Sequence, residues 1–211
     1  SSSAVLMSFG TRSWQTLLLR MSGVVWNVSN SDLTSLMPKS PLMVVVEDVR
    51  SADDSPQSII DVDRWERLAT AVLRTEHAAG ELTLSFIDQT EIAALNAEHM
   101  GKTGPTDVLS FPLDDDPMPD IDIPVLLGDI VISPAIAARQ YAEHAGTFDD
   151  EIALLVVHGI LHITGHDHVD PTERKAMQKR ERALLSEHHW GGSVPVGFRQ
   201  DHRDDLGNTA E

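Results

Sequence analysis

The residues best suited to chemistry lie between His158 and His168. This stretch reads HGILHITGHDH, with His158 and His162 four residues apart. On a helix that spacing puts both imidazoles on one face, about one turn apart, where both can bind one metal ion. Gly165 allows a sharp turn after His162 and so brings His168 back to the same ion. The spacing therefore predicts an open tetrahedral site for one Zn(2+) ion per chain, with three neutral imidazoles and one water as ligands.

The same histidine spacing and glycine occur in metzincin proteases, so a metzincin-like metalloprotease is one interpretation. In those enzymes a glutamate follows the first histidine and acts as the general base. Gly159 holds that position here and cannot accept a proton. Peptide hydrolysis therefore ranks below the other hydrolytic reactions that a metal-activated water supports. We leave His166 out of the ligand set, because its side chain should diverge from that of His168 in an extended turn.

The composition limits what else the chain could be. It has 211 residues, 33 acidic against 16 basic, a net charge of -17 and no cysteine. Without cysteine, disulfides, iron–sulfur clusters and cysteine nucleophiles are excluded, and a metal must be bound by His, Asp or Glu. No apolar run approaches the roughly 18 residues of a membrane span. The net charge opposes non-specific attraction to phosphate backbones and by itself argues against a nucleic-acid partner.

The segments that must position the histidines alternate between strand and helix patterns. Strand patterns cover 43–49, 82–86, 108–111 and 126–132, and helix patterns cover 61–80, 88–100, 133–146, 147–162 and 170–189. The helix that carries the first two histidines is almost wholly apolar. These patterns predict an α/β (α+β) fold, a single small mixed, partly parallel sheet of about four strands covered by about five helices. The three-His metal site then lies at the end of a central helix.

Three parts of the chain differ in pattern. Residues 1–42 lack sustained periodicity and carry three basic residues against one acid, so we predict a disordered or upstream extension, with an organellar transit peptide as an alternative. Residues 43–190 form the patterned domain. Residues 191–211 are predicted to be a flexible C-terminal tail.

Two further motifs accompany the histidine stretch, PTDVLSFP at 105–112 and LGDIV at 127–131. Together with His158, Gly159, Leu161, His162, Gly165, Asp167 and His168, they occur in the order and spacing of the YbeY family of bacterial endoribonucleases. The chain resembles that family over about 43–190. The resemblance implies a zinc-dependent, single-strand-specific endoribonuclease with the metal on His158, His162 and His168.

The resemblance also implies a biological setting. Family members mature the 3′ end of small-subunit rRNA and act in ribosome quality control, in the cytoplasm and away from membranes. The implied partners are rRNA and the small ribosomal subunit, with a ribosomal protein and a ribosome-assembly GTPase. RNA binding conflicts with the acidity of the chain unless one face is locally positive. The metal, Arg139, Lys102 and the basic last helix could form such a groove.

One departure from the family pattern concerns Met100, which stands where the family often has a basic arginine thought to matter for catalysis. Methionine cannot clamp a phosphate or stabilise transition-state charge. Either Lys102 or Arg139 substitutes, or the chain is a weaker nuclease. The departure also motivates a further alternative, a non-catalytic ribosome assembly factor that contains zinc.

The residues that move protons are not determined by these motifs. Asp107, Asp167 and Arg139 are the catalytic candidates, and Asp167 could instead orient a ligating imidazole. Asp107, like Asp129, lies at a strand edge, where turn or cap roles are common. Either a metal-activated water or the RNA 2′-hydroxyl is the nucleophile, and the product ends distinguish the two.

Overall fold

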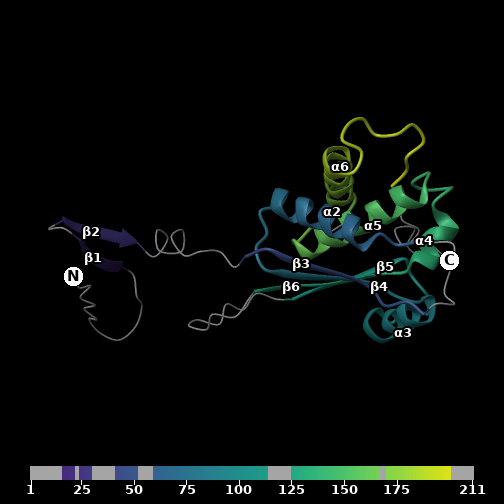
Figure 1. Ribbon diagram of the computed structural model, residues 1–211, viewed down its shortest axis with the longest axis horizontal. Helices are drawn as coiled ribbons and strands as arrows, with labels where there is room; N and C mark the ends of the chain where they lie inside the picture. The colour runs from purple at the N-terminus through teal and green to yellow at the C-terminus, as the bar shows by residue number, and fades with distance from the viewer. Residues whose placement is uncertain are drawn as a thin grey trace. The chain divides into compact units, whose positions relative to one another are not determined.

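The computed structural model describes residues 16–21, 24–29, 41–51, 59–113, 125–166 and 170–200 (Figure 1). Contacts divide the chain into two units, Ser1–Lys39 and Ser40–Glu211. In the first unit, β1 (Thr16–Met21) pairs antiparallel with β2 (Val24–Ser29). These strands lie within residues 1–42, which the sequence predicts to be a disordered or upstream extension. Val24, Val25, Trp26 and Val28 of β2 are residue types that favour strands. Each strand has only six residues, too few to give residues 1–42 a sustained hydrophobic period.

The second unit is built on a four-stranded sheet (Figure 1). Its strands are β3 (Met43–Asp48), β4 (Glu81–Phe86), β5 (Val108–Pro112) and β6 (Leu126–Ile132), in the order β3-β4-β6-β5. The first three in that order are parallel, and β5 runs antiparallel to β6. The prediction of one small mixed, partly parallel sheet is confirmed.

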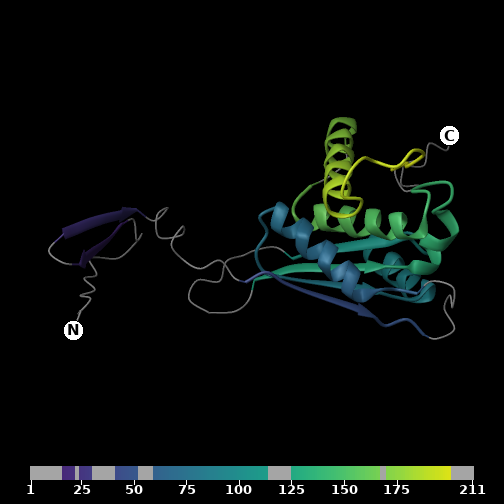
Figure 2. The same ribbon diagram turned by 45° about the horizontal axis from the view of Figure 1, so that its top comes forward.

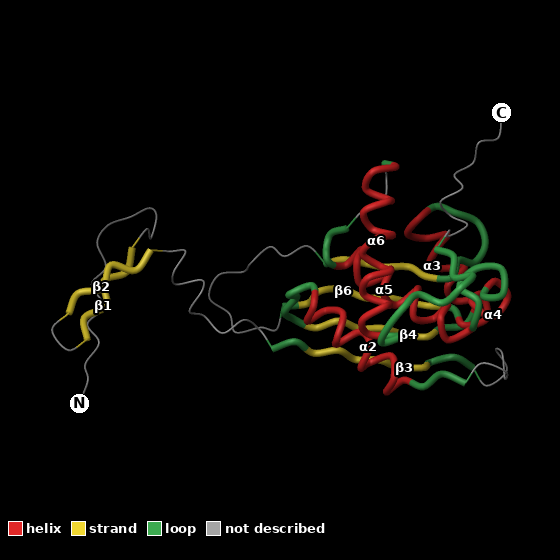
Figure 3. The backbone as a smooth tube through the Cα atoms, turned by 90° about the horizontal axis from the view of Figure 1, so that it is seen from above, coloured by secondary structure: helices red, strands yellow, loops and turns green. Residues whose placement is uncertain are grey.

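Helices cover both faces of this sheet. They are α2 (Val62–Thr75), α3 (Gln89–Met100), α4 (Pro134–Gln140), α5 (Phe148–Ile163) and α6 (Pro171–His188). Viewed from above, α2, α5 and α6 lie over the strands (Figure 3), whereas α3 lies on the opposite face (Figure 1). The main core therefore lies between the sheet and α2, α5 and α6, and a smaller core lies under α3.

The alternation of side chains in the strands explains the two cores. In β4, Leu82, Leu84 and Phe86 are fully buried and belong to the main core. In β6, Ile130 and Ile132 point the same way, and Val131 between them packs under α3. Side chains alternate between the faces of a strand, so one sheet serves both cores.

Helix α5 is central because it is covered on nearly every side. It packs against the sheet, α2 and α6 (Figure 2), and residues 152–157 are fully buried. Only an apolar helix can occupy such a place, which explains its sequence. Thr147 begins it, its hydroxyl accepting a hydrogen bond from the Asp150 amide at 3.1 Å. The helix carries His158 and His162 in its last two turns.

Two boundaries differ from the sequence prediction. Helix α4 ends at Gln140, before Gly146, because the chain continues as a turn closed by the Gly146 amide on the Tyr141 carbonyl at 2.7 Å. Residues 191–200, predicted as part of a flexible tail, return to the body of the domain. Phe198 is 7% exposed and meets the ring of Trp190 edge-on at 4.9 Å, so burial of an aromatic ring orders this segment.

Gly128 in β6 occupies a position that only glycine fits. Its φ is +142°, and a Cβ there would lie 2.3 Å from the Phe111 carbonyl oxygen and 2.7 Å from Ile163 Cδ1. We expect Gly128→Ala to lower the free energy of unfolding by about 3 kcal/mol or more, measured by urea denaturation. Gly146→Ala is the control, because its φ of +99° is strained but its Cβ would meet nothing. Equal losses in the two variants would contradict the steric account.

Asp150 makes the start of α5 sensitive to acid. Burial raises the pKa of its carboxyl, but hydrogen bonds from Thr147, Trp190 and His189 outweigh this and hold the pKa below its ordinary value of 3.8. A lowered folded-state pKa contributes stability above the unfolded pKa and loses it as pH falls through the folded pKa. Below about pH 4, unfolding free energy should therefore fall less steeply in Asp150→Asn than in wild type. Identical pH profiles from urea denaturation would refute this.

Candidate metal centre

Helix α5 brings His158 and His162 together. Their Nε2 atoms lie 3.1 Å apart, and the ring centroids are 4.6 Å apart with the planes at 78°. His158 is 8% exposed and His162 is partly buried. The predicted helical spacing thus places both rings on one face, each with the same nitrogen turned toward the other.

This geometry fits two ligands of one metal ion. Two imidazole nitrogens about 2.0–2.1 Å from a tetrahedral zinc lie about 3.3 Å from each other. The observed separation of 3.1 Å is close to that value. Within the described residues no group of three His, Asp or Glu side chains could hold a metal. The third predicted ligand, His168, and the acid–base candidate Asp167 lie outside the described residues.

Glu181 on α6 holds the first histidine in place, and sequence reasoning missed it. Its Oε1 lies 2.8 Å from His158 Nδ1, and its Oε2 accepts a hydrogen bond from Gln200 Nε2 at 2.8 Å. Glu181 is 1% exposed. When Nδ1 donates to a carboxylate, the proton stays on that nitrogen and Nε2 keeps its lone pair, as metal ligation requires.

A signal for Glu181 was present in the sequence. It falls four residues after Met177 and three before Leu184, both buried on the inner face of α6. A carboxylate in the apolar stripe of a helix needs a partner, because an unpaired buried charge is costly. The pattern could have indicated a buried polar contact, although not its partner on α5.

His166 is engaged elsewhere. Its Nε2 lies 3.4 Å from Glu76 Oε2, at the C-terminal end of α2. Glu76 also accepts from Arg180 of α6, at 2.7 Å from Nε and 2.6 Å from the terminal nitrogen. Leaving His166 out of the ligand set stays a prediction.

Two of the catalytic candidates take part in contacts between elements. Asp107, just before β5, accepts hydrogen bonds from the Val108 amide at 2.9 Å and from Gln140 Nε2 at 2.6 Å, which tie β5 to α4. Arg139 of α4 donates to Gln89 Oε1 of α3 at 2.8 Å. Their roles in proton transfer or charge stabilisation stay predictions.

Gly159 faces the sheet. A Cβ there would lie 2.9 Å from Ile130 Cγ2 and 3.1 Å from Ser110 Oγ. A glutamate at this position would have no room, because α5 lies directly on β5 and β6. The residue that supplies the base in metzincins is thus replaced by one that lets the helix approach the sheet.

The sheet order and the HxxxH helix define a small mixed α/β protein with a candidate metal site on its central helix. A family model described as Endoribonuclease YbeY matches residues 51–189. The chain belongs to the YbeY family and is an endoribonuclease.

Individual relatives share much of its length. An endoribonuclease YbeY from Mycolicibacterium gilvum is 41% identical over 167 residues, covering 74% of this chain and 91% of the relative. One from Cutibacterium acnes is 40% identical over 134 residues, covering 62% and 79%. A solution structure of a Thermotoga maritima protein matches with a TM-score of 0.45 and 23% identity, covering 71% of this chain and 93% of that one.

Proposed function

We propose that this endoribonuclease cuts single-stranded RNA at a zinc centre on His158, His162 and His168, and that its substrate is the 3′ end of small-subunit rRNA. The observation that supports the centre is the convergence of two Nε2 atoms at 3.1 Å, with the ring of His158 held by Glu181. The match to the YbeY family supports the RNA substrate.

Each residue has a distinct part in this proposal. His158 and His162 would hold the ion through their Nε2 atoms, and Glu181 would keep the proton of His158 on Nδ1. A bound zinc supplies a Lewis acid that activates water near neutral pH and offsets phosphate charge. Asp107 or Asp167 acts as the general acid or base. Arg139 or Lys102 contacts the phosphate, in place of the arginine that the family often has. Met100 ends α3 and is 46% exposed, so its side chain does not fill the core.

The wider setting is proposed from the family resemblance. It comprises ribosome quality control in the cytoplasm, alongside a ribosomal protein and a ribosome-assembly GTPase. In the described part of the chain, no helix is both long and apolar enough to span a bilayer.

The proposal is tested by incubating the zinc-loaded protein with a single-stranded fragment of small-subunit rRNA, the same fragment in a duplex, and a peptide substrate. We expect cleavage of the single strand alone. A 2′,3′-cyclic phosphate on the product would assign the nucleophile to the RNA 2′-hydroxyl, whereas a 5′-phosphate would indicate water. Peptide cleavage without RNA cleavage would favour the protease, and no cleavage at all would favour the assembly factor.

A further inference from the structure

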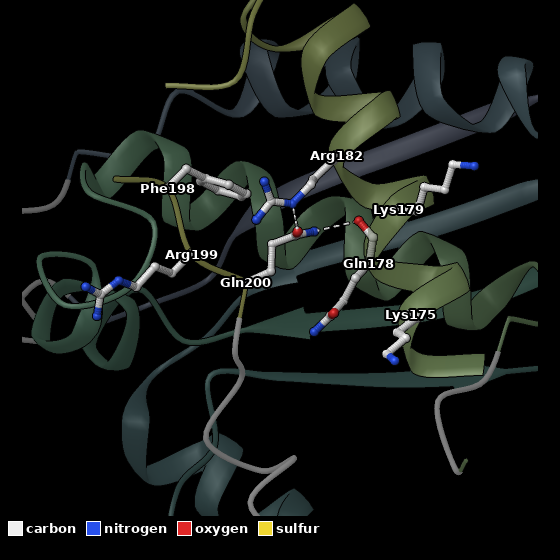
Figure 4. Close-up of a pocket in the computed structure, with 7 residues that line it drawn as sticks. All are labelled: Lys175, Gln178, Lys179, Arg182, Phe198, Arg199 and Gln200. Atoms are coloured by element: carbon white, nitrogen blue, oxygen red, sulfur yellow. Dashed lines mark hydrogen bonds between the residues drawn. The ribbon is translucent and has the colours of Figure 1, made fainter. Parts of the chain in front are cut away.

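A basic pocket lies between α6 and the segment that follows it. It has a volume of about 370 Å³ and is lined by Lys175, Gln178, Lys179, Arg182, Phe198, Arg199 and Gln200 (Figure 4). Four of these residues are cationic and none is acidic, in a chain with a net charge of -17. Phe198, Arg199 and Gln200 lie beyond the residues that the family model matches.

The floor of the pocket is ordered by buried groups. Gln200 is 4% exposed, and its Nε2 donates to the Gln178 carbonyl and to Glu181 Oε2, each at 2.8 Å. Its Oε1 accepts from Arg182 Nε (Figure 4). The guanidinium of Arg182 also lies 5.6 Å from the centre of the Phe198 ring. Arg182 is thus held in one orientation before any ligand arrives, which lowers the entropic cost of binding.

The remaining cations are open to an anion. Lys175 and Lys179 are exposed and one turn apart on α6, and Arg199 is exposed on the following segment. Within the described residues, no carboxylate forms a salt bridge with these three side chains. Like charges gathered in this way repel one another, and a bound anion would relieve that repulsion.

The chemistry of the pocket favours phosphates over bases. Its open groups are ammonium and guanidinium donors, which suit phosphate oxygens. Phe198 is 7% exposed and already covered by Arg182, so little aromatic surface is left for a base to stack on. Contacts of this kind do not depend on base sequence.

The pocket is also connected to the candidate metal centre. The hydrogen-bonded chain runs from Arg182 to Gln200, then to Glu181, and ends at His158. A ligand on the outer face of α6 and a metal on α5 therefore share the same positioning groups.

We propose that this pocket binds backbone phosphates of the single-stranded RNA substrate, outside the bond that is cut. The inference rests on the proposed function for the identity of the polymer. The basic face of α6 then explains how a strongly acidic protein holds RNA, since the local field at the pocket opposes that of the whole chain.

The test compares the double variant Lys175→Gln/Lys179→Gln with wild type in binding a fluorescein-labelled 2′-O-methyl oligouridine, followed by anisotropy over a range of salt concentrations. We expect about tenfold weaker binding and a log–log salt slope smaller by about 1.4, the value for two lost single-strand phosphate contacts. The matched control is Arg67→Gln/Arg74→Gln, which removes two exposed cations from α2 and changes the net charge equally.

Each outcome separates this inference from the proposed function. Loss of binding in the α6 variant but not in the α2 variant supports the pocket. Equal binding by wild type and both variants, or equal weakening of both variants, overturns the pocket and leaves the proposed function standing. If wild type does not bind the oligonucleotide, both fail. The same proteins are also tested for binding to poly-glutamate, an acidic polypeptide. If the α6 variant loses binding to poly-glutamate but not to RNA, the pocket is a protein-docking site and the inference is wrong.

Discussion

A His162→Ala variant should bind zinc at least about 100-fold more weakly than wild type and cleave RNA at least about 1,000-fold more slowly. In the proposed centre His162 is one of three protein donors, so its removal should cost more than the 10–100-fold typical of residues that only orient a ligand. Zinc affinity is measured by competition with a chromogenic chelator, and cleavage under single-turnover conditions.

The control is His166→Ala. This histidine lies four residues further on and is partly buried like His162, but its Nε2 faces Glu76 at 3.4 Å. It should keep zinc affinity and cleavage within a few-fold of wild type. Equal losses in the two variants would mean that the pair on α5 has no special role.

A Glu181→Gln variant should bind zinc about 10- to 100-fold more weakly while remaining folded. Glutamine can accept one hydrogen bond from His158 Nδ1, but its amide would face the Nε2 donor of Gln200, which now donates to the carboxylate. The ring of His158 therefore loses either its acceptor or its fixed orientation. Chelator competition measures the affinity, and circular dichroism checks the fold.

The matched variant for that comparison is Glu187→Gln. Glu187 lies on the same helix, and its side chain is 64% exposed. Glu187→Gln changes the net charge by the same amount as Glu181→Gln, but it alters no contact with His158. If the two variants bind zinc equally well, Glu181 does not position the ligand.

Much of the fold could be predicted because its determinants are local in the chain. The alternation of Leu82, Leu84 and Phe86 predicts a strand with one buried face, and the structure places these residues in the main core. The nearly continuous apolar run of α5 predicts a buried helix, and residues 152–157 are fully buried. The spacing of His158 and His162 likewise predicts that their rings meet.

What could not be predicted depends on contacts between distant segments. Glu181 reaches His158 across 23 residues, and no local pattern relates a carboxylate on one helix to an imidazole on another. Residues 198–200 follow a stretch containing glycine and proline, which predicts a loose tail. Only the packing of Phe198 against Trp190 and of Gln200 against α6 shows that the chain returns to the domain.

Titration of metal-free protein with zinc, with bound metal and RNA cleavage measured in the same samples, tests the central claim most directly. We predict that cleavage of the single-stranded rRNA fragment rises in proportion to bound zinc and stops rising at one ion per chain. In His162→Ala neither quantity should rise over the same range of zinc concentration. Full cleavage by the metal-free protein, or cleavage unrelated to the amount of bound zinc, would contradict the account.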